Sequence, residues 1–183
     1  MGGFLVRLIT VEDVPQLLEL SRRCAEEWQH PAATYPRDEA QVKLDLFGKA
    51  SVDRVFVAEK GDRLLGFATW RSTYDFLFCQ KGGEISFLYV SPEARCRGIA
   101  AALLTQICAD IRNQGGCFAW ASYNPEQMTT ARLYNRVVIS SPNPHISCHL
   151  SARAFEAMAD LAGKSPRYIA RNLPDKALNY SPK

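Results

Sequence analysis

Residues 83–104 have the sequence GEISFLYVSPEARCRGIAAALL and predict a strand, a tight loop and a helix in succession. Residues 85–90 are rich in β-branched and aromatic side chains, which favours a strand. Ser91-Pro92 ends that strand, because proline has no N–H to donate to a β-ladder. Apolar side chains then recur at helical spacing and predict one buried stripe, formed by Ile99, Leu103, Leu104, Ile107, Cys108 and Ile111.

The loop before this helix has the chemistry of an anion-binding site. The first N–H groups of a helix have no partner within it, and the helix dipole adds partial positive charge there. Gly98 and Ala100 are small enough to let a diphosphate approach the backbone. Arg95 and Arg97 can donate charge-assisted hydrogen bonds to the same ligand. A plain strand–helix turn with solvated arginines has the same spacing, so the spacing alone leaves both interpretations open.

The stretch resembles the central motif of the GNAT superfamily of N-acetyltransferases, which use acetyl-CoA. The family motif Gln/Arg-x-x-Gly-x-Gly/Ala is met by Arg95, Gly98 and Ala100, and residues 88–93 resemble the strand end that precedes it. The resemblance is clear over residues 4–134. It implies the acyl-CoA N-acyltransferase fold, an α/β (α+β) fold with a mixed, mostly antiparallel sheet flanked by helices. We expect one such domain over residues 1–163, followed by a C-terminal tail at 164–183.

The resemblance also implies a set of residues that bind acetyl-CoA. The loop N–H groups would meet the pyrophosphate, and main-chain N–H groups near the strand end would hold the pantetheine arm and polarise the thioester carbonyl. The family often has an asparagine three residues before Ala131, where this chain has Met128, so Asn124 is the candidate for the usual pantetheine contact. The expected cofactor-binding residues are Leu88, Tyr89, Val90, Arg95, Cys96, Arg97, Gly98, Ile99, Ala100 and Asn124.

Glu84 is the candidate general base. A protonated amine cannot attack a thioester, so a carboxylate with a raised pKa in a cleft would have to accept the proton. Glu84 stands six residues before Val90, the offset of the base glutamate in histone-acetylating members of the superfamily. Strict alternation would place Glu84, Ser86, Leu88 and Val90 on one face of the strand. The alternative is a structural glutamate at the start of the strand.

Tyr134 is the candidate general acid. The sequence Ala-Arg-Leu-Tyr at residues 131–134 resembles the second signature of the family, whose tyrosine often lies near the cofactor sulfur and can protonate the leaving thiolate. The alternative is an aromatic core residue on a helix. After this tyrosine the family commonly has Gly-Phe, whereas this chain has Asn135-Arg136. A non-catalytic acyl-CoA sensor, or a transferase that uses another acyl donor, therefore remains an alternative to an N-acetyltransferase.

The remaining elements supply the rest of the sheet and the other helices. Strands are predicted at residues 4–9, 54–59, 64–70 and 117–123, and helices at residues 14–28 and 37–49. We expect Val42, Leu44 and Phe47 in the second helix to be partly buried. Residues 74–81 predict a link between strands whose apolar patch, 76–78, either lies beside the acceptor or caps the sheet.

Aromatic residues near the first two helices are candidates for the wall of the acceptor site. In the family these helices and their connection line that cleft, which makes candidates of Trp28, His30, Tyr35 and Phe47. The alternative for all four is ordinary packing or surface exposure.

Composition narrows the classes of partner. The 183 residues are 47% hydrophobic and 22% charged, which is enough for one good core. The net charge of +3 is too small to indicate nucleic-acid binding. The absence of a membrane-length apolar run and of a signal-peptide pattern favours a cytoplasmic protein without membrane attachment. The cysteines and histidines lack metal-site spacing, so no metal is expected. The expected partner is a small-molecule or peptide amine, and the late strands or tail can mediate a homodimer.

Overall fold

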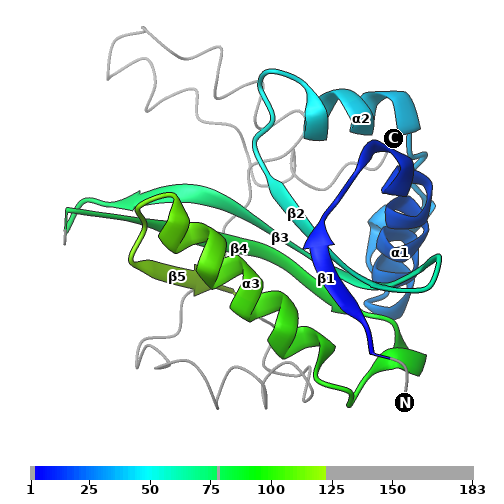
Figure 1. Ribbon diagram of the computed structural model, residues 1–183. Helices are drawn as coiled ribbons and strands as arrows, with labels where there is room; N and C mark the ends of the chain where they lie inside the picture. Colours follow the sequence, from blue (N-terminus) through cyan, green and yellow to red (C-terminus); the bar gives the residue numbers. More distant parts are fainter. Residues whose placement is uncertain (1–2, 78, 123–183) are drawn as a thin grey trace, which may run out of the picture. The chain divides into compact units, whose positions relative to one another are not determined.

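A five-stranded sheet in the order β1-β2-β3-β4-β5 forms the centre of the protein (Figure 1). The computed structural model describes residues 3–77 and 79–122. The strands are β1 Leu5–Leu8, β2 Arg54–Lys60, β3 Arg63–Asp75, β4 Gln80–Val90 and β5 Phe118–Ala121. All neighbours pair antiparallel except β4 and β5, which are parallel. The predicted mixed, mostly antiparallel sheet is therefore confirmed, whereas the domain boundary predicted at residue 163 lies outside the described residues.

Three α-helices and three short 3₁₀ helices complete the described part of the chain. The helices are α1 Val14–Glu27, α2 Glu39–Phe47 and α3 Ile99–Asn113, and the 3₁₀ helices are η1 Val11–Asp13, η2 Pro31–Thr34 and η3 Pro92–Ala94. Asp38 caps α2, since its carboxylate accepts the Ala40 N–H at 2.9 Å. At η1, Arg7 donates to the nearly buried Asp13 at 2.6 Å, and this hydrogen bond lowers the pKa of Asp13 to about 2.

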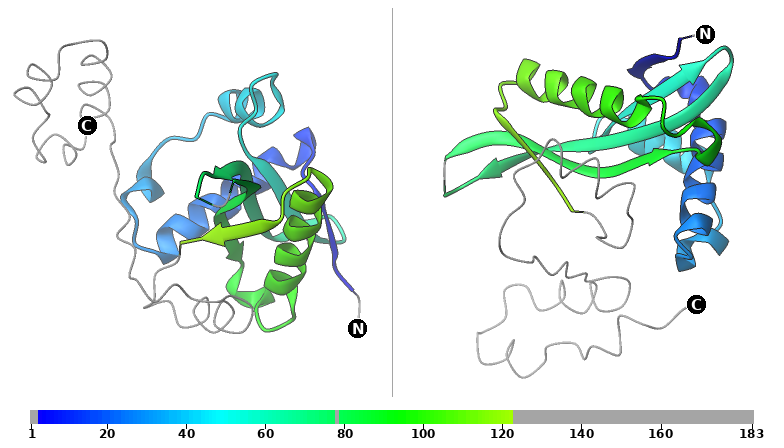
Figure 2. Two further views of the ribbon diagram at one scale, coloured as in Figure 1. Left: turned by 90° about the vertical axis from the view of Figure 1, so that its left-hand side faces the viewer. Right: turned by 90° about the horizontal axis from the view of Figure 1, so that it is seen from below.

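The two faces of the sheet carry separate apolar clusters. Alternate residues of β2 point to opposite faces, so Phe56 packs with α3 whereas Val57 packs with α1. Figure 2 shows α3 along one face of the sheet and α1 on the other side. The predicted buried stripe of α3 is confirmed for its leucines and isoleucines, and Leu103 and Ile107 are fully buried. The prediction was wrong for Cys108, which is exposed because it lies just outside that stripe.

A partly buried polar contact joins α3 to the sheet. Asp110 of α3 accepts the indole N–H of Trp70 at 3.0 Å and pairs with Arg54 Nε at 2.6 Å. Trp70 is only 1% exposed, so this bond satisfies an indole donor that would otherwise be buried without a partner.

A β-bulge in β4 overturns the predicted alternation around Glu84. Thr69 of β3 lies opposite Phe87 and the next residue, Trp70, lies opposite Ile85, so Ser86 is the extra residue. Ile85 joins Val90 in the cluster under α3, and Glu84, as its neighbour along the strand, points to the opposite face. Glu84 therefore shares no face with Leu88 and Val90. It lies on the α1 face instead.

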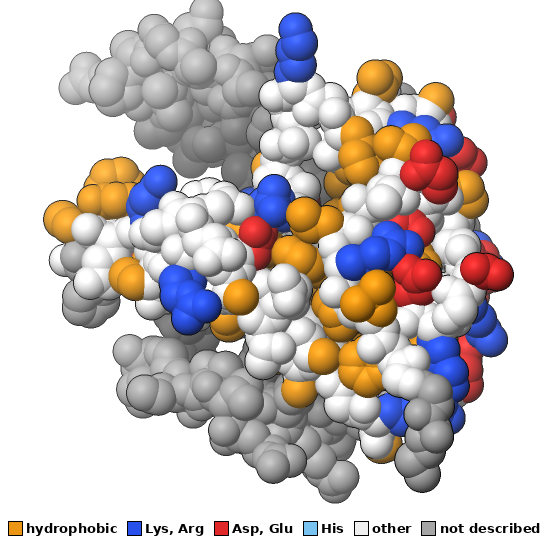
Figure 3. Space-filling view, in the orientation of Figure 1, with side chains coloured by type: hydrophobic (Ala, Val, Ile, Leu, Met, Phe, Trp, Pro, Cys, Tyr) orange, Lys and Arg blue, Asp and Glu red, His pale blue; other side chains and the backbone are white. Residues whose placement is uncertain are grey.

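The segment predicted as a link at residues 74–81 is a hairpin tip. Strand β3 runs to Asp75 and β4 starts at Gln80, so only a short turn separates them. Phe76 and Leu77 are 83% and 93% exposed at that tip, seen at the left end of Figure 3. They do not cap the sheet, while Phe78 lies outside the described residues. In α2, Leu44 is 66% exposed, so the partial burial predicted for it was also wrong.

We predict a clear difference between two leucine truncations. Leu103→Ala removes a fully buried side chain between α3 and the sheet and should lower the free energy of unfolding by about 2–5 kcal/mol. Leu44→Ala removes an exposed side chain and should change it by less than about 0.5 kcal/mol. Urea unfolding followed by circular dichroism measures both. An equal loss of unfolding free energy in the two variants would contradict the burial of Leu103 and the exposure of Leu44.

Candidate acyl-donor site

Among the described residues, no strand pairs with the outer edge of β4 at its C-terminal end, which is therefore called the open edge. Strand β5 pairs with β4 only from Gly82 to Ile85, and Figure 2 shows it diverging from β4 beyond that point. The Ser91 N–H bonds to Leu65 of β3 at 2.9 Å, so alternation turns the N–H groups of Leu88 and Val90 away from β3. These two N–H groups therefore face the gap that β5 leaves.

The first turn of α3 presents a second set of N–H groups. The first helical hydrogen bond is donated by Ala102 to Gly98 O at 3.0 Å, which leaves the preceding N–H groups without helical partners. Gly98 caps the helix with a φ of +82°, and Cys96 also has a positive φ of +60°. Alternation of positive and negative φ gathers successive N–H groups on one concave side, which suits an anion. A side chain built onto Gly98 would meet no atom within 4 Å, so the space around it is open.

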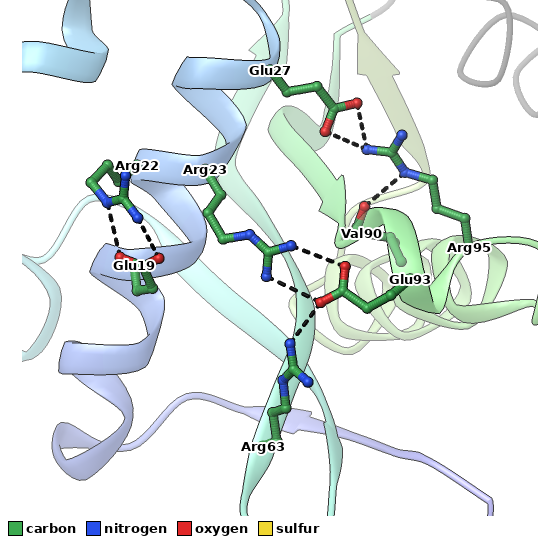
Figure 4. Close-up of polar contacts among 8 residues, drawn as sticks. All are labelled: Glu19, Arg22, Arg23, Glu27, Arg63, Val90, Glu93 and Arg95. Carbon is green, nitrogen blue, oxygen red and sulfur yellow. Dashed lines mark hydrogen bonds and ion pairs between the residues drawn. The ribbon is translucent and has the colours of Figure 1, made fainter.

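Arg95 ties this loop to α1 and to the end of β4. Its Nε donates to Val90 O at 2.9 Å, and its Nη2 donates to both carboxylate oxygens of Glu27 at 2.6 and 2.7 Å (Figure 4). The guanidinium also lies 5.9 Å from the centre of the Tyr89 ring. The side chain of Arg95 is thus engaged within the protein, whereas Arg97 is exposed.

Glu93 makes a second link between the same loop and the rest of the protein. It accepts hydrogen bonds from Arg23 of α1 at 2.9 Å and from Arg63 of β3 at 2.6 Å (Figure 4). The hydrogen bond from Arg23 lowers the pKa of Glu93 to about 2, so the carboxylate is charged at neutral pH. Partly exposed pairs of this kind contribute only about 0.2–1 kcal/mol each, so they orient the loop more than they stabilise the fold.

The sequence did not identify these anchors. Arg23 and Glu27 stand four residues apart on α1 and so share a helix face, but their partners lie about seventy positions away in the chain. The sequence shows only that Arg23 and Glu27 are two of several charged residues on α1, and nothing in it points to their distant partners.

Glu84 and an aromatic pair lie on the α1 face near the bulge. Glu84 pairs with Arg71 Nε at 3.1 Å, and its side chain is 30% exposed. Trp28 at the end of α1 stacks on Phe87 with ring centres 6.1 Å apart, and both rings are partly exposed. Trp28 was a candidate for the acceptor wall, whereas Phe87 was not identified from the sequence.

The predicted cofactor-binding residues differ in their surroundings. Main-chain atoms of Leu88, Val90, Cys96, Arg97, Gly98 and Ala100 lie at the open edge and the helix start, whereas the side chain of Arg95 bonds to Glu27 and Val90. Tyr89 and Ile99 have buried side chains, and the ring of Tyr89 packs under α1. Asn124 and the predicted acid Tyr134 lie outside the described residues.

The arrangement combines two sets of main-chain donors at one end of the sheet. The β4 edge offers donors to an extended amide-bearing chain, and the α3 start offers donors and positive potential to a phosphate group. This arrangement suits a ligand that combines a phosphate group with an extended, amide-bearing arm.

Sequence comparison identifies the family. The sequence model of the acetyltransferase (GNAT) family matches residues 14–138. The chain therefore belongs to the GNAT family, and it is an acyltransferase. A comparison with curated proteins finds no sequence match.

Solved structures share the fold at low sequence identity. One is a ribosomal-protein-alanine N-acetyltransferase from Brucella melitensis biovar Abortus 2308, with a TM-score of 0.66 and 15% identity over 81% of this chain and 100% of that one. Another is an aminoglycoside acetyltransferase from an uncultured soil metagenomic sample, in complex with sisomicin, with a TM-score of 0.69 and 13% identity over 82% and 97%. An integron cassette protein from V. cholerae has a TM-score of 0.68 and 18% identity over 87% and 98%. At these identities the likeness establishes the fold.

Within residues 3–77 and 79–122, no helix has the length and apolarity needed to cross a membrane. The same residues contain no group of three or more histidine, cysteine, aspartate or glutamate side chains arranged to hold a metal ion.

We predict that loss of one anchor loosens the loop without unfolding the protein. Glu27→Gln removes the charge that holds Arg95, so amide hydrogen exchange in the peptide covering residues 91–104 should become several-fold faster. Glu26→Gln is the matched control, because Glu26 pairs with Arg22 inside the same helix. Hydrogen-exchange mass spectrometry measures both variants. Unchanged exchange in Glu27→Gln would contradict the anchoring role.

Proposed function

We propose that the protein transfers an acetyl group from acetyl-CoA to a primary amine by direct attack. The observation that carries this proposal is the pair of donor sets at one end of the sheet, at Leu88 and Val90 on β4 and at the start of α3. Two such donor sets suit a ligand that has both a phosphate group and an extended arm. Membership of the GNAT family supports acetyl-CoA as that ligand.

In this proposal each loop residue has a part suited to its position. The N–H groups at Gly98, Ile99 and Ala100 bind the pyrophosphate, and exposed Arg97 adds charge. Arg95 and Cys96 hold the loop in its conformation, Arg95 through its bonds to Glu27 and Val90. The N–H groups of Leu88 and Val90 hold the pantetheine arm, with Tyr89 fixing that segment in the core, and Asn124 adds a further contact to the arm.

The reaction needs two proton transfers and no covalent enzyme intermediate. The neutral amine attacks the thioester carbonyl carbon, and a main-chain N–H of the β4 edge stabilises the negative oxygen that forms. Glu84, directly or through water, takes the proton that the nitrogen loses. As the carbon–sulfur bond breaks, Tyr134 donates a proton to the thiolate and gives free CoA. Holding both substrates in line supplies much of the rate enhancement.

The acceptor belongs to the amines as a class. The two acetyltransferases with a similar fold are named for a ribosomal-protein alanine and for aminoglycosides, so the shared fold supports more than one kind of acceptor. The α1 face beside Glu84, with the exposed Trp28–Phe87 pair, is where the acceptor would approach the thioester. We also propose that the protein is cytoplasmic and that it forms a homodimer.

Charge at position 98 tests the donor site. Gly98→Glu puts a negative charge where the pyrophosphate binds, and like charges in contact cost several kcal/mol, so the affinity for acetyl-CoA should fall by about a hundredfold or more. Gly98→Gln has the same size and the same backbone strain at positive φ, so it should lose much less. Calorimetric titration with acetyl-CoA measures both, and thermal melts check folding. Equal affinities in the two variants would refute the phosphate site.

Removal of one hydroxyl separates an enzyme from a sensor. Tyr134→Phe should lower amine-dependent release of the CoA thiol by about 10²–10⁴-fold and leave acetyl-CoA binding unchanged, because only the proton donor is lost. Tyr74→Phe, which alters an exposed tyrosine on the β3–β4 hairpin, is the control. Thiol release is followed with a panel of amines. Binding of acetyl-CoA without release for any amine would instead indicate a sensor.

A further inference from the structure

A cavity lies between α1, α2 and the α1 face of the sheet. Its volume is about 250 Å³. Its apolar wall includes Leu17 of α1 and Phe67 of β3, and its polar lining includes Asp45 of α2, Asp53 before β2 and Thr69 of β3. The cavity is on the same face as Glu84 and the Trp28–Phe87 pair, and none of its lining residues belongs to the donor site.

The polar lining of this cavity has acceptor atoms without matching donors. Thr69 is 8% exposed, and its Oγ1 has no hydrogen-bond partner among the described residues. The Oδ1 atom of Asp53 is likewise buried and without a partner. Asp45 accepts one hydrogen bond, from Gln41, but no described lysine or arginine pairs with either aspartate. Buried polar atoms are normally satisfied, so these oxygens indicate a missing donor.

A primary ammonium group has the chemistry that this lining lacks. It carries three N–H donors, no acceptor and one positive charge. Its donors suit carboxylate and hydroxyl oxygens such as those of this lining, and its charge offsets that of the aspartates. The methylene stem that carries an ammonium group can lie against the leucine and phenylalanine of the apolar wall.

The cavity is close to the reacting centre without coinciding with it. Thr69 lies opposite Phe87 on β4, and Phe87 is next to Leu88, whose N–H faces the open edge. Strands lie about 4.8 Å apart, so the cavity and the gap beyond β4 are separated by about two strand spacings, ~10 Å. A group held in the cavity is therefore a different part of the acceptor from the amine that attacks.

We propose that this cavity binds a second ammonium group of the acceptor and thereby selects amines with at least two cationic nitrogens. The proposal rests on the proposed N-acetyltransferase activity and adds the class of its acceptor. Asp53 and Asp45 supply the charge, Thr69 supplies a hydroxyl acceptor, and the attacking nitrogen lies on the α1 face beside β4.

A matched pair of amines tests the selection. Diaminohexane with terminal amino groups and hexylamine have the same chain length and differ by the second ammonium. With wild-type protein and saturating acetyl-CoA, the KM for the diamine should be lower by about tenfold or more, since hydrogen bonds between charged groups are worth that factor. Asp53→Asn should raise the KM for the diamine by about the same factor and leave hexylamine unaffected. Asp62→Asn, in the exposed β2–β3 turn, is the control for net charge.

Direct binding separates failure of this proposal from failure of the proposed activity. Calorimetric titration of diaminohexane into the protein with CoA bound needs no turnover, and binding that weakens in Asp53→Asn but not in Asp62→Asn supports the cavity. Should the Asp53 variant lose its fold, Asp45→Asn replaces it, because Asp45 lines the same cavity and is an exposed residue outside the core. Equal KM values for the two amines, or diamine binding that neither Asp53 nor Asp45 affects, would overturn the proposal. Loss of transfer with every amine, while diamine binding persists, would instead refute only the activity.

Discussion

The backbone of β4 beyond its bulge is the constraint on which the rest of the structure depends. Strand β4 needs β3 on one side along its whole length, but β5 accompanies it on the other side only to Ile85. The N–H groups of Leu88 and Val90 then face a gap, and unpaired main-chain donors are costly unless water or a ligand satisfies them. A sheet that ends this way has room for an extended ligand to take the place of a strand.

The helices and the loop fix the position of the elements on either side of that gap. Packing of Leu103 and Ile107 fixes α3 against one face, so the start of α3 is set beside the end of β4. On the other face, α1 reaches across to the loop through two ion pairs, Glu27 with Arg95 and Arg23 with Glu93. Contacts from both faces therefore fix the position of the donors at the helix start relative to the donors on the strand edge. This explains how an exposed loop with two residues at positive φ holds one conformation.

Local patterns predicted the fold well and the site unevenly. Apolar periodicity located α3, and the β-rich runs at residues 54–59 and 64–70 located β2 and the first part of β3, because those signals depend on neighbours in the chain. The face of Glu84 was mispredicted, because the bulge at Ser86 depends on how β3 and β4 pair. The order of polar and apolar residues along β4 does not reveal it. The ion pair between Glu27 and Arg95 joins segments that are far apart in the chain. The unpaired oxygens of the cavity likewise come from different segments. Only the folded structure therefore reveals these features.

The most direct test of the account is a map of main-chain N–H groups that respond to the acyl carrier. Two-dimensional ¹H–¹⁵N spectra of the labelled protein, recorded with and without CoA, report each amide separately. We predict that the largest chemical-shift changes occur at the amides of Leu88, Val90 and residues 98–100, at the strand edge and the helix start together. Saturable binding with those amides unchanged would contradict it, because the carrier would then lie elsewhere on the protein.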